Sequence, residues 1–395
     1  MKHYDTTQID NQYVANTYAR FPLNIVRGQG AYAYDENGKC YIDLGSGIAV
    51  NTLGYSDAGW VEAVTEQLQT LQHTSNLYYT DPCALLAEQL CLRTGMKKVF
   101  FSNSGAEANE CAIKVARKYA ADKKGADHYT IVTLESSFHG RTLTTLAATG
   151  QEVFHKDFLP LTPGFVHVPP NDKDALAASL QQHKVAAIML EPVQGEGGVC
   201  ALDPDYVAFA AKIAAEQDVL LIADEVQTGN GRTGTLYAYM QYGFTPDILS
   251  TAKGLGGGLP LGATLLGEKV QDTLTPSSHG STFGGNPVCC AGALHVLFHL
   301  DEAFLQSVRE KAAYVRQRLA GCDGIFDISG LGLMIGFCTK KDANAVVAAC
   351  REQGVLVIKA KHKIRLLPPL NIEQDILEKA LDVIVAVCGE SEVSA

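Results

Sequence analysis

The sequence lacks any run of about 20 apolar residues that could span a membrane, because its longest uncharged stretches are rich in glycine or interrupted by serine, histidine and asparagine. Its first residues, Met1–Asp5, lack the apolar core of a secretory signal peptide, so we expect a cytoplasmic protein. Basic residues are not in excess, since 32 Lys and Arg stand against 43 Asp and Glu. This balance disfavours general binding to nucleic acids or anionic membranes, although a local basic pocket could hold an anionic ligand.

Several short motifs are also missing. No two of the 11 cysteines form a C-x-x-C pair, and the adjacent Cys289 and Cys290 lie in an apolar segment, which predicts buried, reduced side chains. Neither the P-loop pattern nor H-E-x-x-H occurs, so P-loop phosphoryl transfer is unsupported. His295 and His299 stand one helical turn apart in an apolar segment, where packing is a better explanation than zinc binding. We therefore predict no metal site.

The apolar content of 47% over 395 residues is enough for a folded core and excludes general disorder. We expect a large domain over residues 61–286 and a smaller α+β domain over residues 287–395. Residues 1–60 form an N-terminal segment with a predicted β-hairpin, because Asn37-Gly38 separates two apolar runs.

Apolar runs of strand length alternate with amphipathic helical patterns in the large domain, which predicts a doubly wound, mostly parallel α/β sheet covered on both faces. Such sheets bind ligands at the carboxyl ends of their strands. The predicted strands are Val99–Phe101, Tyr129–Leu134, Val185–Leu190, Val219–Ala223 and Leu261–Leu266.

Three features near the predicted strand ends are candidates for a ligand site. Ser104 and Glu107 form a capping-box pattern after the first strand, which predicts a helix N-terminus that either is simply capped or binds an anion such as phosphate. Asp224 directly follows a buried strand and therefore needs a cationic partner. Lys253 lies among small and apolar residues, where burial would lower its pKa. A lysine, an aspartate and a helix N-terminus together are the set that binds pyridoxal phosphate.

Seven motifs follow one another along the chain: Phe101–Asn109, Ser137–Thr142, Glu191–Gly198, Asp224–Gly234, Ala252–Gly262, His279–Pro287 and Arg365–Leu370. In this order they resemble the motifs of the class III (ornithine-type) aminotransferases, and within them most closely those of the acetylornithine aminotransferases. The resemblance extends over nearly the whole chain and implies a fold-type I enzyme that depends on pyridoxal phosphate.

The resemblance also implies roles around the cofactor ring. Lys253 would attach the cofactor covalently and then move a proton, while Asp224 would keep the pyridine nitrogen protonated. Gln227 would hydrogen-bond the ring hydroxyl, and Phe138 and Val226 would cover the two ring faces.

The cofactor phosphate would be bound by the helix N-terminus at Ser104, Gly105 and Ala106. In the family, the residue that corresponds to Thr282 reaches the phosphate of the neighbouring subunit. The resemblance therefore implies a homodimer with shared active sites.

Substrate recognition is implied in the same way. Arg141 would bind the carboxylate far from the reacting amine, and Arg365 would bind the α-carboxylate of glutamate. Glu196 would pair with Arg365 while the ω-amino substrate is bound, and Ser281 is a further candidate contact. Gly47 stands where ornithine aminotransferases carry a tyrosine, which favours an N-acylated donor.

The implied reaction moves the δ-amino group of N2-acetylornithine to 2-oxoglutarate, in arginine biosynthesis. Succinylornithine, succinyl-diaminopimelate, ornithine and 4-aminobutyrate are alternative donors. A binding protein without activity would be expected to lack Lys253 or Asp224, and a decarboxylase or racemase would not need two carboxylate-binding arginines.

Two further features of the sequence lie outside this assignment. Gly229–Gly234 matches the G-x-G-x-x-G fingerprint, with Asp247 as a ribose-binding acid, but it does not directly follow a strand, so an NAD-dependent oxidoreductase is a remote alternative. Tyr55 and Ala58 depart from the Gly-His-x-His-Pro pattern of the family, in a region away from the assigned chemistry.

Overall fold

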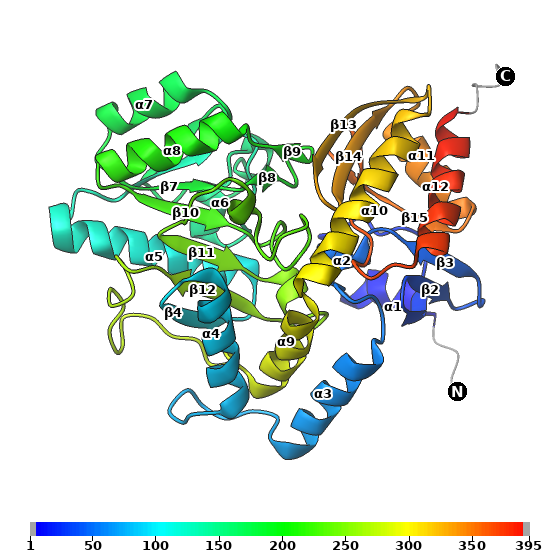
Figure 1. Cartoon of the computed structure of the whole chain (residues 1–395), viewed down its shortest axis with the longest axis horizontal. Helices are drawn as coiled ribbons and strands as arrows, with labels where there is room; N and C mark the ends of the chain where they lie inside the picture. The colour runs from blue at the N-terminus through cyan, green and yellow to red at the C-terminus, as the bar shows by residue number, and fades with distance from the viewer. Residues whose placement is uncertain (1–4, 390–395) are drawn as a thin grey trace.

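The computed structural model describes residues 5–389, and a seven-stranded sheet forms its centre (Figure 1). All neighbouring strands are parallel except at β12, which is antiparallel to both β11 and β4. In spatial order the strands are β4 (Lys98–Ser102), β12 (Gly262–Leu266), β11 (Ile248–Thr251), β10 (Leu220–Asp224), β7 (Val185–Leu190), β5 (Thr130–Leu134) and β6 (Phe165–Val168).

Helices cover both faces of this sheet, which explains the continuous apolar runs in its strands. On β7, Met189 belongs to the core under α5 (Gly105–Lys124), whereas its neighbour Ile188 belongs to the core on the opposite face. That second core includes α7 (Lys173–Gln182) and α8 (Pro204–Glu216), which lie above the sheet in Figure 1. The predicted doubly wound, mostly parallel α/β fold is therefore confirmed.

The N-terminal segment forms the predicted hairpin and extends it. β2 (Tyr32–Asp35) pairs with β3 (Cys40–Asp43), and the turn is fixed by Asp35, whose Oδ1 accepts the N–H groups of Asn37 and Lys39 at 2.9 Å each. β1 (Ile25–Gln29) pairs with the other edge of β2. The Asn-Gly turn thus accounts for the pairing of β2 with β3, and β1 extends the hairpin to three strands.

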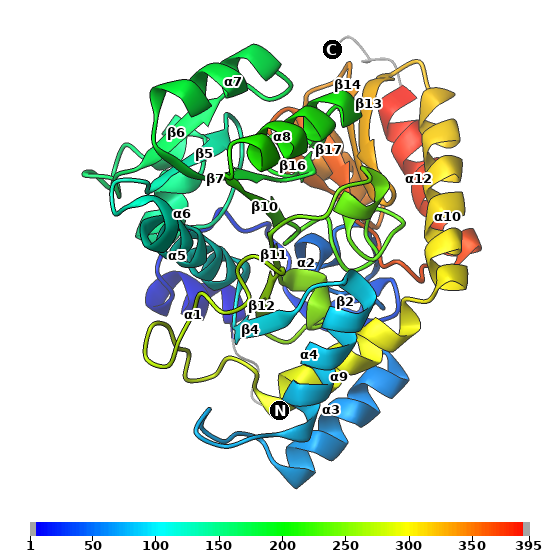
Figure 2. The same ribbon diagram turned by 60° about the vertical axis from the view of Figure 1, so that its left-hand side comes forward.

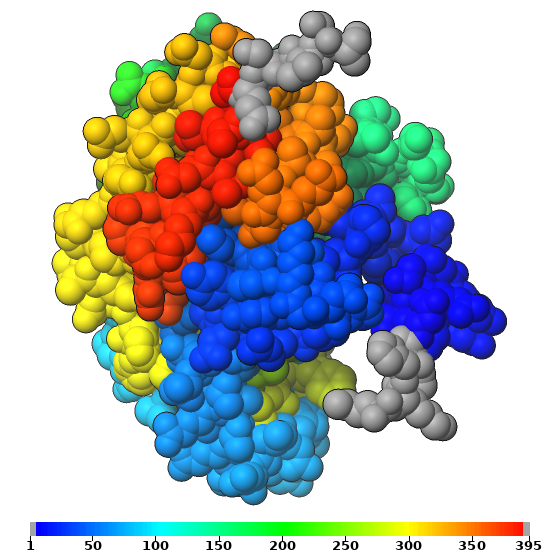
Figure 3. Space-filling view, turned by 90° about the vertical axis from the view of Figure 1, so that its right-hand side faces the viewer, coloured from blue at the N-terminus to red at the C-terminus, as the bar shows by residue number. Residues whose placement is uncertain are grey.

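The fourth strand of that sheet comes from the far end of the chain. β15 (Val355–Leu356) runs parallel to β3, with Val355 opposite Ile42. Figure 3 shows the result on the surface, where the blue N-terminal residues lie directly against the orange and red C-terminal ones. The N-terminal segment is therefore joined to the C-terminal part of the protein by backbone hydrogen bonds.

The C-terminal part contains a separate four-stranded sheet, which lies beside α10 (Glu302–Ala320) and α12 (Gln374–Gly389) in Figure 2. α11 (Ala343–Glu352) packs against α12. The strands in spatial order are β13 (Ile325–Leu331), β14 (Met334–Thr339), β17 (Lys363–Leu366) and β16 (Ile358–Ala360). The domain boundaries at residues 60 and 286 stay predictions. α9 (Pro287–His299), which follows the second boundary, packs on α3 (Ala58–Thr70) and α4 (Asp81–Thr94).

The packing of α9 accounts for the two histidines one turn apart. Nε2 of His295 lies 2.9 Å from Oδ1 of Asp57, and that same oxygen accepts the N–H of Trp60 as the N-cap of α3. Nδ1 of His299 lies 2.8 Å from the carbonyl oxygen of His295. His295 therefore ties α9 to the start of α3, in agreement with a packing role.

Tyr55, which departs from the family pattern, also has a structural explanation. Its hydroxyl donates to Oδ2 of Asp43 on β3 at 2.8 Å. A Cβ on Gly28 of β1 would lie 2.4 Å from the Tyr55 ring, so the ring packs directly on the hairpin backbone. Tyr55 thus fastens the start of α3 to the N-terminal sheet, and Ala58 is simply the first residue of that helix.

Within residues 5–389 no single helix is long and apolar enough to cross a membrane, and only α9 and α10 taken together, with a bend of 74° between them, pass a test of length and composition.

The double role of Asp57 gives a prediction about stability. Asp57→Ala should remove the cap of α3 and leave His295 without its partner, at a cost of about 2 kcal/mol in the free energy of unfolding. Asp172→Ala is the matched control, because Asp172 caps α7 through Ala175 N–H alone and should cost about 1 kcal/mol. Urea denaturation measures both, and equal losses would contradict the tie between α3 and α9.

Candidate active site

The N-terminus of α5 lies at the carboxyl end of β4 and forms one wall of a cavity of about 460 Å³. Oγ of Ser104 accepts the N–H of Glu107 at 3.2 Å, so Ser104 is the N-cap as predicted. The Glu107 carboxylate accepts the N–H of Asn103 instead of that of Ser104, which corrects the expected capping box. The N–H groups of Gly105 and Ala106, in the first turn, have no partner within the helix.

Gly105 lets the helix approach the loop after β10. A Cβ on Gly105 would lie 2.6 Å from Cγ1 of Val226, which is closer than carbon atoms can pack. Val226 and Phe138 both border the cavity, as does the first turn of α5. The absence of a side chain at Gly105 therefore sets the width of the cavity between the helix and Val226.

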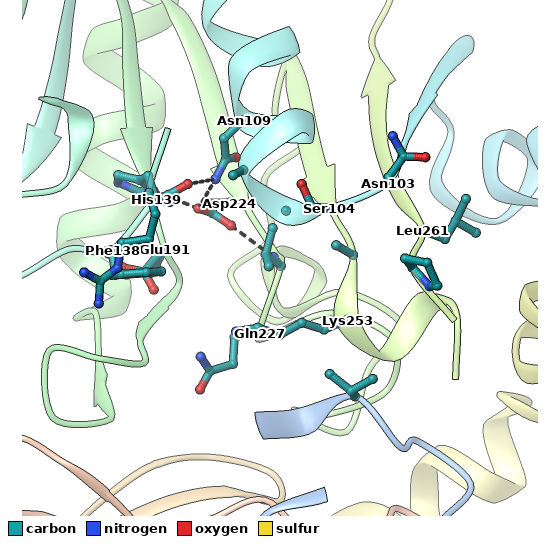
Figure 4. A pocket seen from close by; sticks show the side chains of 18 of the residues that line it. Asn103, Ser104, Asn109, Phe138, His139, Glu191, Asp224, Gln227, Lys253 and Leu261 are labelled. Carbon is teal, nitrogen blue, oxygen red and sulfur yellow. Dashed lines mark hydrogen bonds and ion pairs between the residues drawn. The ribbon is translucent and has the colours of Figure 1, made fainter. Parts of the chain in front are cut away.

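Asp224 ends β10 and is 3% exposed, with three hydrogen-bond donors around its carboxylate. Oδ2 accepts from Nδ2 of Asn109 at 2.8 Å and from Nδ1 of His139 at 2.7 Å (Figure 4). Oδ1 accepts the N–H of Val226 at 3.0 Å and has a second acceptor position. Because Asp224 borders the cavity, that position is available to a ligand. The arrangement favours an ionised carboxylate that can accept one more proton donor from a ligand.

Sequence reasoning missed the partners Asn109 and His139. Burial disfavours the charged form of His139, but the hydrogen bond to Asp224 outweighs it and raises the pKa of the imidazole. Asn109 is 1% exposed on the helix face that packs on the sheet. A buried amide in an otherwise apolar helical stripe needs a polar partner, and that was the available signal.

Lys253 follows β11 and also borders the cavity. Its φ of +47° is unusual for a residue with a side chain and marks a site where surrounding structure imposes the backbone conformation. Burial, and secondarily the charge of Arg365, lowers the pKa of the Lys253 amine to about 8. The predicted lysine and aspartate thus lie in the same cavity (Figure 4).

Glu191 is a third cavity residue that sequence reasoning did not single out. It follows β7, is 5% exposed, and accepts the N–H groups of Phe138 at 2.9 Å and Gly195 at 3.2 Å. Burial raises the pKa of its carboxyl to about 7. Its position after a strand, like that of Asp224, was the usable signal.

The predicted substrate residues fall into two groups. Arg141 borders the cavity directly. Arg365 is buried on β17, where its Nη1 donates to Oε1 of Glu196 at 2.7 Å and to Oε1 of Gln227 at 3.1 Å. Only Gln227 of these three borders the cavity, so Arg365 and Glu196 are connected to it through Gln227.

Two predicted residues, Ser281 and Thr282, do not border this cavity. Oγ of Ser281 accepts from Nδ2 of Asn103 at 3.3 Å, which attaches its loop to the start of α5. Thr282 is exposed. Gly47 lies in α2 (Ser46–Ala49) with a φ of +64°, and a Cβ there would make only ordinary contacts.

Comparison with known proteins identifies the family. The family model for class-III aminotransferases matches residues 13–388. The chain belongs to the class-III aminotransferases. A protein named acetylornithine aminotransferase from Haemophilus ducreyi is 52% identical over 97% of this chain and 98% of its own length. One of the same name from Caldanaerobacter subterraneus is 44% identical over 96% and 98%.

Solved structures of class-III aminotransferases share the fold. An ornithine aminotransferase from Toxoplasma gondii, described with partial occupancy of PLP at its active site, has a TM-score of 0.92 at 34% identity, covering 96% of this chain and 93% of its own. An N-acetylornithine aminotransferase from Stenotrophomonas maltophilia has a TM-score of 0.84 at 35% identity, covering 96% and 97%.

The cofactor of this family is pyridoxal phosphate, and the residues of the cavity fit it. The unpaired N–H groups at the start of α5 suit a phosphate, and the narrow gap at Gly105 would be closed by any side chain. The spare acceptor position on Asp224 suits a protonated pyridine nitrogen, and Lys253 supplies an amine of lowered pKa. The resemblance to the class-III aminotransferases that the sequence motifs indicated is therefore confirmed.

The NAD-dependent alternative is wrong. Residues 229–234 form turns that begin five residues beyond β10, and the next helical element is the short 3-10 helix η2 (Ala238–Gln241) rather than an α-helix. The carboxylate of Asp247 is occupied, because it accepts the N–H of Leu221 at 2.9 Å and pairs with Lys269.

The contact at Gly105 gives a prediction about the cofactor. Gly105→Ala should push Val226 into the cavity and weaken the binding of pyridoxal phosphate by about tenfold or more, as expected for an overpacked site. Gly321→Ala is the control, because the nearest atom to its new Cβ would be 3.6 Å away, an ordinary contact. Absorbance titration of the apoprotein measures both dissociation constants, and equal values would show that the gap at Gly105 is not needed.

Proposed function

We propose that this class-III aminotransferase moves the δ-amino group of N2-acetylornithine to 2-oxoglutarate, which gives N-acetylglutamate 5-semialdehyde and glutamate in arginine biosynthesis. The observation that carries the proposal is the presence of Lys253, Asp224 and Arg141 in one cavity at the strand ends. The similarity in sequence to proteins named acetylornithine aminotransferase supports the choice of donor.

Bound pyridoxal phosphate supplies an electron-poor ring that withdraws electrons from the carbon next to the reacting nitrogen. Asp224 would keep the pyridine nitrogen protonated through its Oδ1, and Asn109 and His139 hold that carboxylate in place. Gly105 and Ala106 would donate their N–H groups to the phosphate, with Ser104 as the cap before them. Phe138 and Val226 would confine the ring, and Nε2 of Gln227, whose Oε1 accepts from Arg365, would donate to the ring hydroxyl.

Lys253 is the base. Its Nζ would hold the cofactor and, once free as an amine, would accept and return the proton that the substrate carbon loses. A pKa of about 8 suits this task, because the amine can both hold and release a proton near neutral pH.

Two arginines select substrates with carboxylates. Arg141 binds the carboxylate remote from the reacting amine of the donor. Ser281, which lies outside the cavity and is hydrogen-bonded to Asn103, stays a candidate contact. Arg365 is paired with Glu196, so its guanidinium does not compete with Arg141 for the carboxylate of the donor. When Glu196 moves away, Arg365 can bind the α-carboxylate of 2-oxoglutarate or glutamate, and one cavity then accepts two unlike substrates.

The acyl group of the donor needs space that a bulky side chain at position 47 would take. Gly47 borders a hollow of about 500 Å³ that Ile48 and Ile358 also line, and an added Cβ there would make ordinary contacts, the nearest at 3.5 Å from Val50. We propose that this space favours an acylated donor over free ornithine. Succinylornithine, succinyl-diaminopimelate and 4-aminobutyrate remain alternative donors for the same residues.

We also propose a homodimer with shared active sites. Thr282 is exposed and does not border the cavity of its own chain, which suits a role in the site of a partner. Next to it lies an exposed apolar surface, formed by Leu77, Tyr78, Tyr79 and Phe283, of which Tyr79 is fully exposed. Asn76 joins the two segments, because its Nδ2 donates to the carbonyl oxygens of Ser281 and Gly284. Exposed aromatic residues of this kind are typical of protein interfaces.

The cytoplasmic location stays a prediction.

A panel of amino donors with 2-oxoglutarate as acceptor tests the function. The value of kcat/KM should be highest for N2-acetylornithine, with ornithine and 4-aminobutyrate at least tenfold lower. A preference for succinylated donors would move the proposal to an alternative acyl group. Absence of glutamate formation with every donor would refute it.

The lowered pKa of Lys253 gives a prediction about pH. The rate at which the apoprotein forms the visible absorption band with pyridoxal phosphate should rise with pH and level off near pH 8, because only the neutral amine reacts. A lysine with an ordinary pKa would make this rate rise until about pH 10. Stopped-flow absorbance measures the profile. Lys253→Ala should form no such band, whereas the surface variant Lys269→Ala should behave like the wild type.

The pairing of Glu196 with Arg365 gives a prediction about substrate choice. Glu196→Ala should leave the Arg365 guanidinium free for carboxylates, so KM for 2-oxoglutarate should fall relative to KM for the amino donor by several-fold. Steady-state kinetics on both substrates measures the ratio, with Glu268→Ala as a surface control. An unchanged ratio in Glu196→Ala would remove the switching role.

A further inference from the structure

The guanidinium of Arg141 lies over the ring of Phe154, an aromatic residue outside all seven sequence motifs. Its central carbon lies 4.1 Å from the centroid of the Phe154 ring, in the short 3-10 helix η1 (Glu152–Phe154). The ring of Phe138, which borders the cavity, is farther from that carbon at 5.5 Å. The two rings meet edge to face with their centroids 5.9 Å apart. Phe154 therefore is the closer support of the Arg141 side chain.

The backbone around Phe154 is fixed on both sides. Before it, Nε2 of Gln151 donates to the carbonyl oxygen of Ser137 at 3.0 Å, and the N–H of Phe154 donates to the carbonyl oxygen of Gln151 at 3.1 Å. After it, His155 is 3% exposed, and its Nε2 lies 2.9 Å and 2.7 Å from carbonyl oxygens at the end of α6 (Leu143–Ala148). The ring thus stands on a turn that is anchored to the loop bearing Phe138 and to α6.

This geometry decides which part of Arg141 stays available. A ring against the face of a guanidinium leaves the in-plane N–H groups free, and those groups bind a carboxylate in bidentate fashion. Across residues 5–389 no acidic side chain forms an ion pair with Arg141, so the stacked ring is the contact that orients it. An exposed arginine without such a support would lose more side-chain entropy when a substrate binds.

We propose that Phe154 is a positioning residue for the carboxylate-bearing substrates, which holds the Arg141 guanidinium with its N–H edge toward the cavity. The proposal rests on the proposed function, in which Arg141 binds the substrate carboxylate. Phe154 does not touch the reacting atoms. Its contribution belongs to binding, and therefore to KM for the donor and for 2-oxoglutarate.

Substitution of the ring provides the first test, with the holoenzyme. Phe154→Leu keeps an apolar side chain without a π face, and it should raise KM for both carboxylate substrates roughly threefold to tenfold at unchanged kcat and an unchanged visible cofactor band. Phe154→Tyr keeps the π face and should restore the wild-type KM. Phe158→Leu is the matched control, an exposed phenylalanine of the same segment, and it should have no effect.

Fluorination separates ring electrostatics from packing. Phenylalanine analogues with one, three and five ring fluorines at position 154 keep the shape of the ring while they weaken and then reverse its quadrupole. KM should rise in steps with fluorine content if the cation–π contact positions Arg141. A KM that rises in Phe154→Leu but not in the fluorinated series would overturn the proposal in favour of packing alone.

Arg141→Ala distinguishes failure of this inference from failure of the proposed function. Arg141→Ala should raise KM more than Phe154→Leu, and the double variant should be no worse than Arg141→Ala alone. A normal KM in Arg141→Ala would refute both the carboxylate role and the support by Phe154. A raised KM in Arg141→Ala with a normal KM in Phe154→Leu would overturn only the role of Phe154.

Discussion

A buried carboxylate at the end of the central strand organises the site. Asp224 is almost inaccessible, so an ionised form requires donors that replace water, and Asn109, His139 and the N–H of Val226 provide them. These donors come from α5, from the loop after β5 and from the loop after β10. Satisfying one charge therefore fixes three separate segments around the cavity, and a shift of any of them would leave a buried polar group unpaired.

The second constraint is the proximity of like charges. Arg365 is buried with Glu196 and Gln227, and its charge helps to lower the pKa of Lys253. The same guanidinium would thus serve two purposes under the proposed function, since its charge favours the neutral form of Lys253 and, once released from Glu196, it would bind carboxylates. A site that handles two substrates in turn with few polar groups benefits from such shared use.

Much of this could be predicted from the sequence, and the failures have a physical reason. Continuous apolar runs revealed β5, β7, β10 and β12, and Asn37-Gly38 revealed the hairpin. β11, with two hydroxyl residues in four positions, carries no such signal, and its place is set by neighbouring strands. Asp224 and Lys253 were visible because charge is costly after a buried strand or among apolar residues. His139 and Phe154 were not, because their roles depend on contacts between segments that no local pattern encodes.

The parallel pairing of β3 with β15 joins residue 42 to residue 355. During synthesis from the N-terminus, the hairpin edge at β3 stays without its partner until nearly the whole chain has been made. An unpaired edge is a site where strands of other chains can add. While the chain is still on the ribosome, the free edge of β3 can therefore pair with a strand of another chain. The large sequence separation between β3 and β15 also slows the formation of their native pairing.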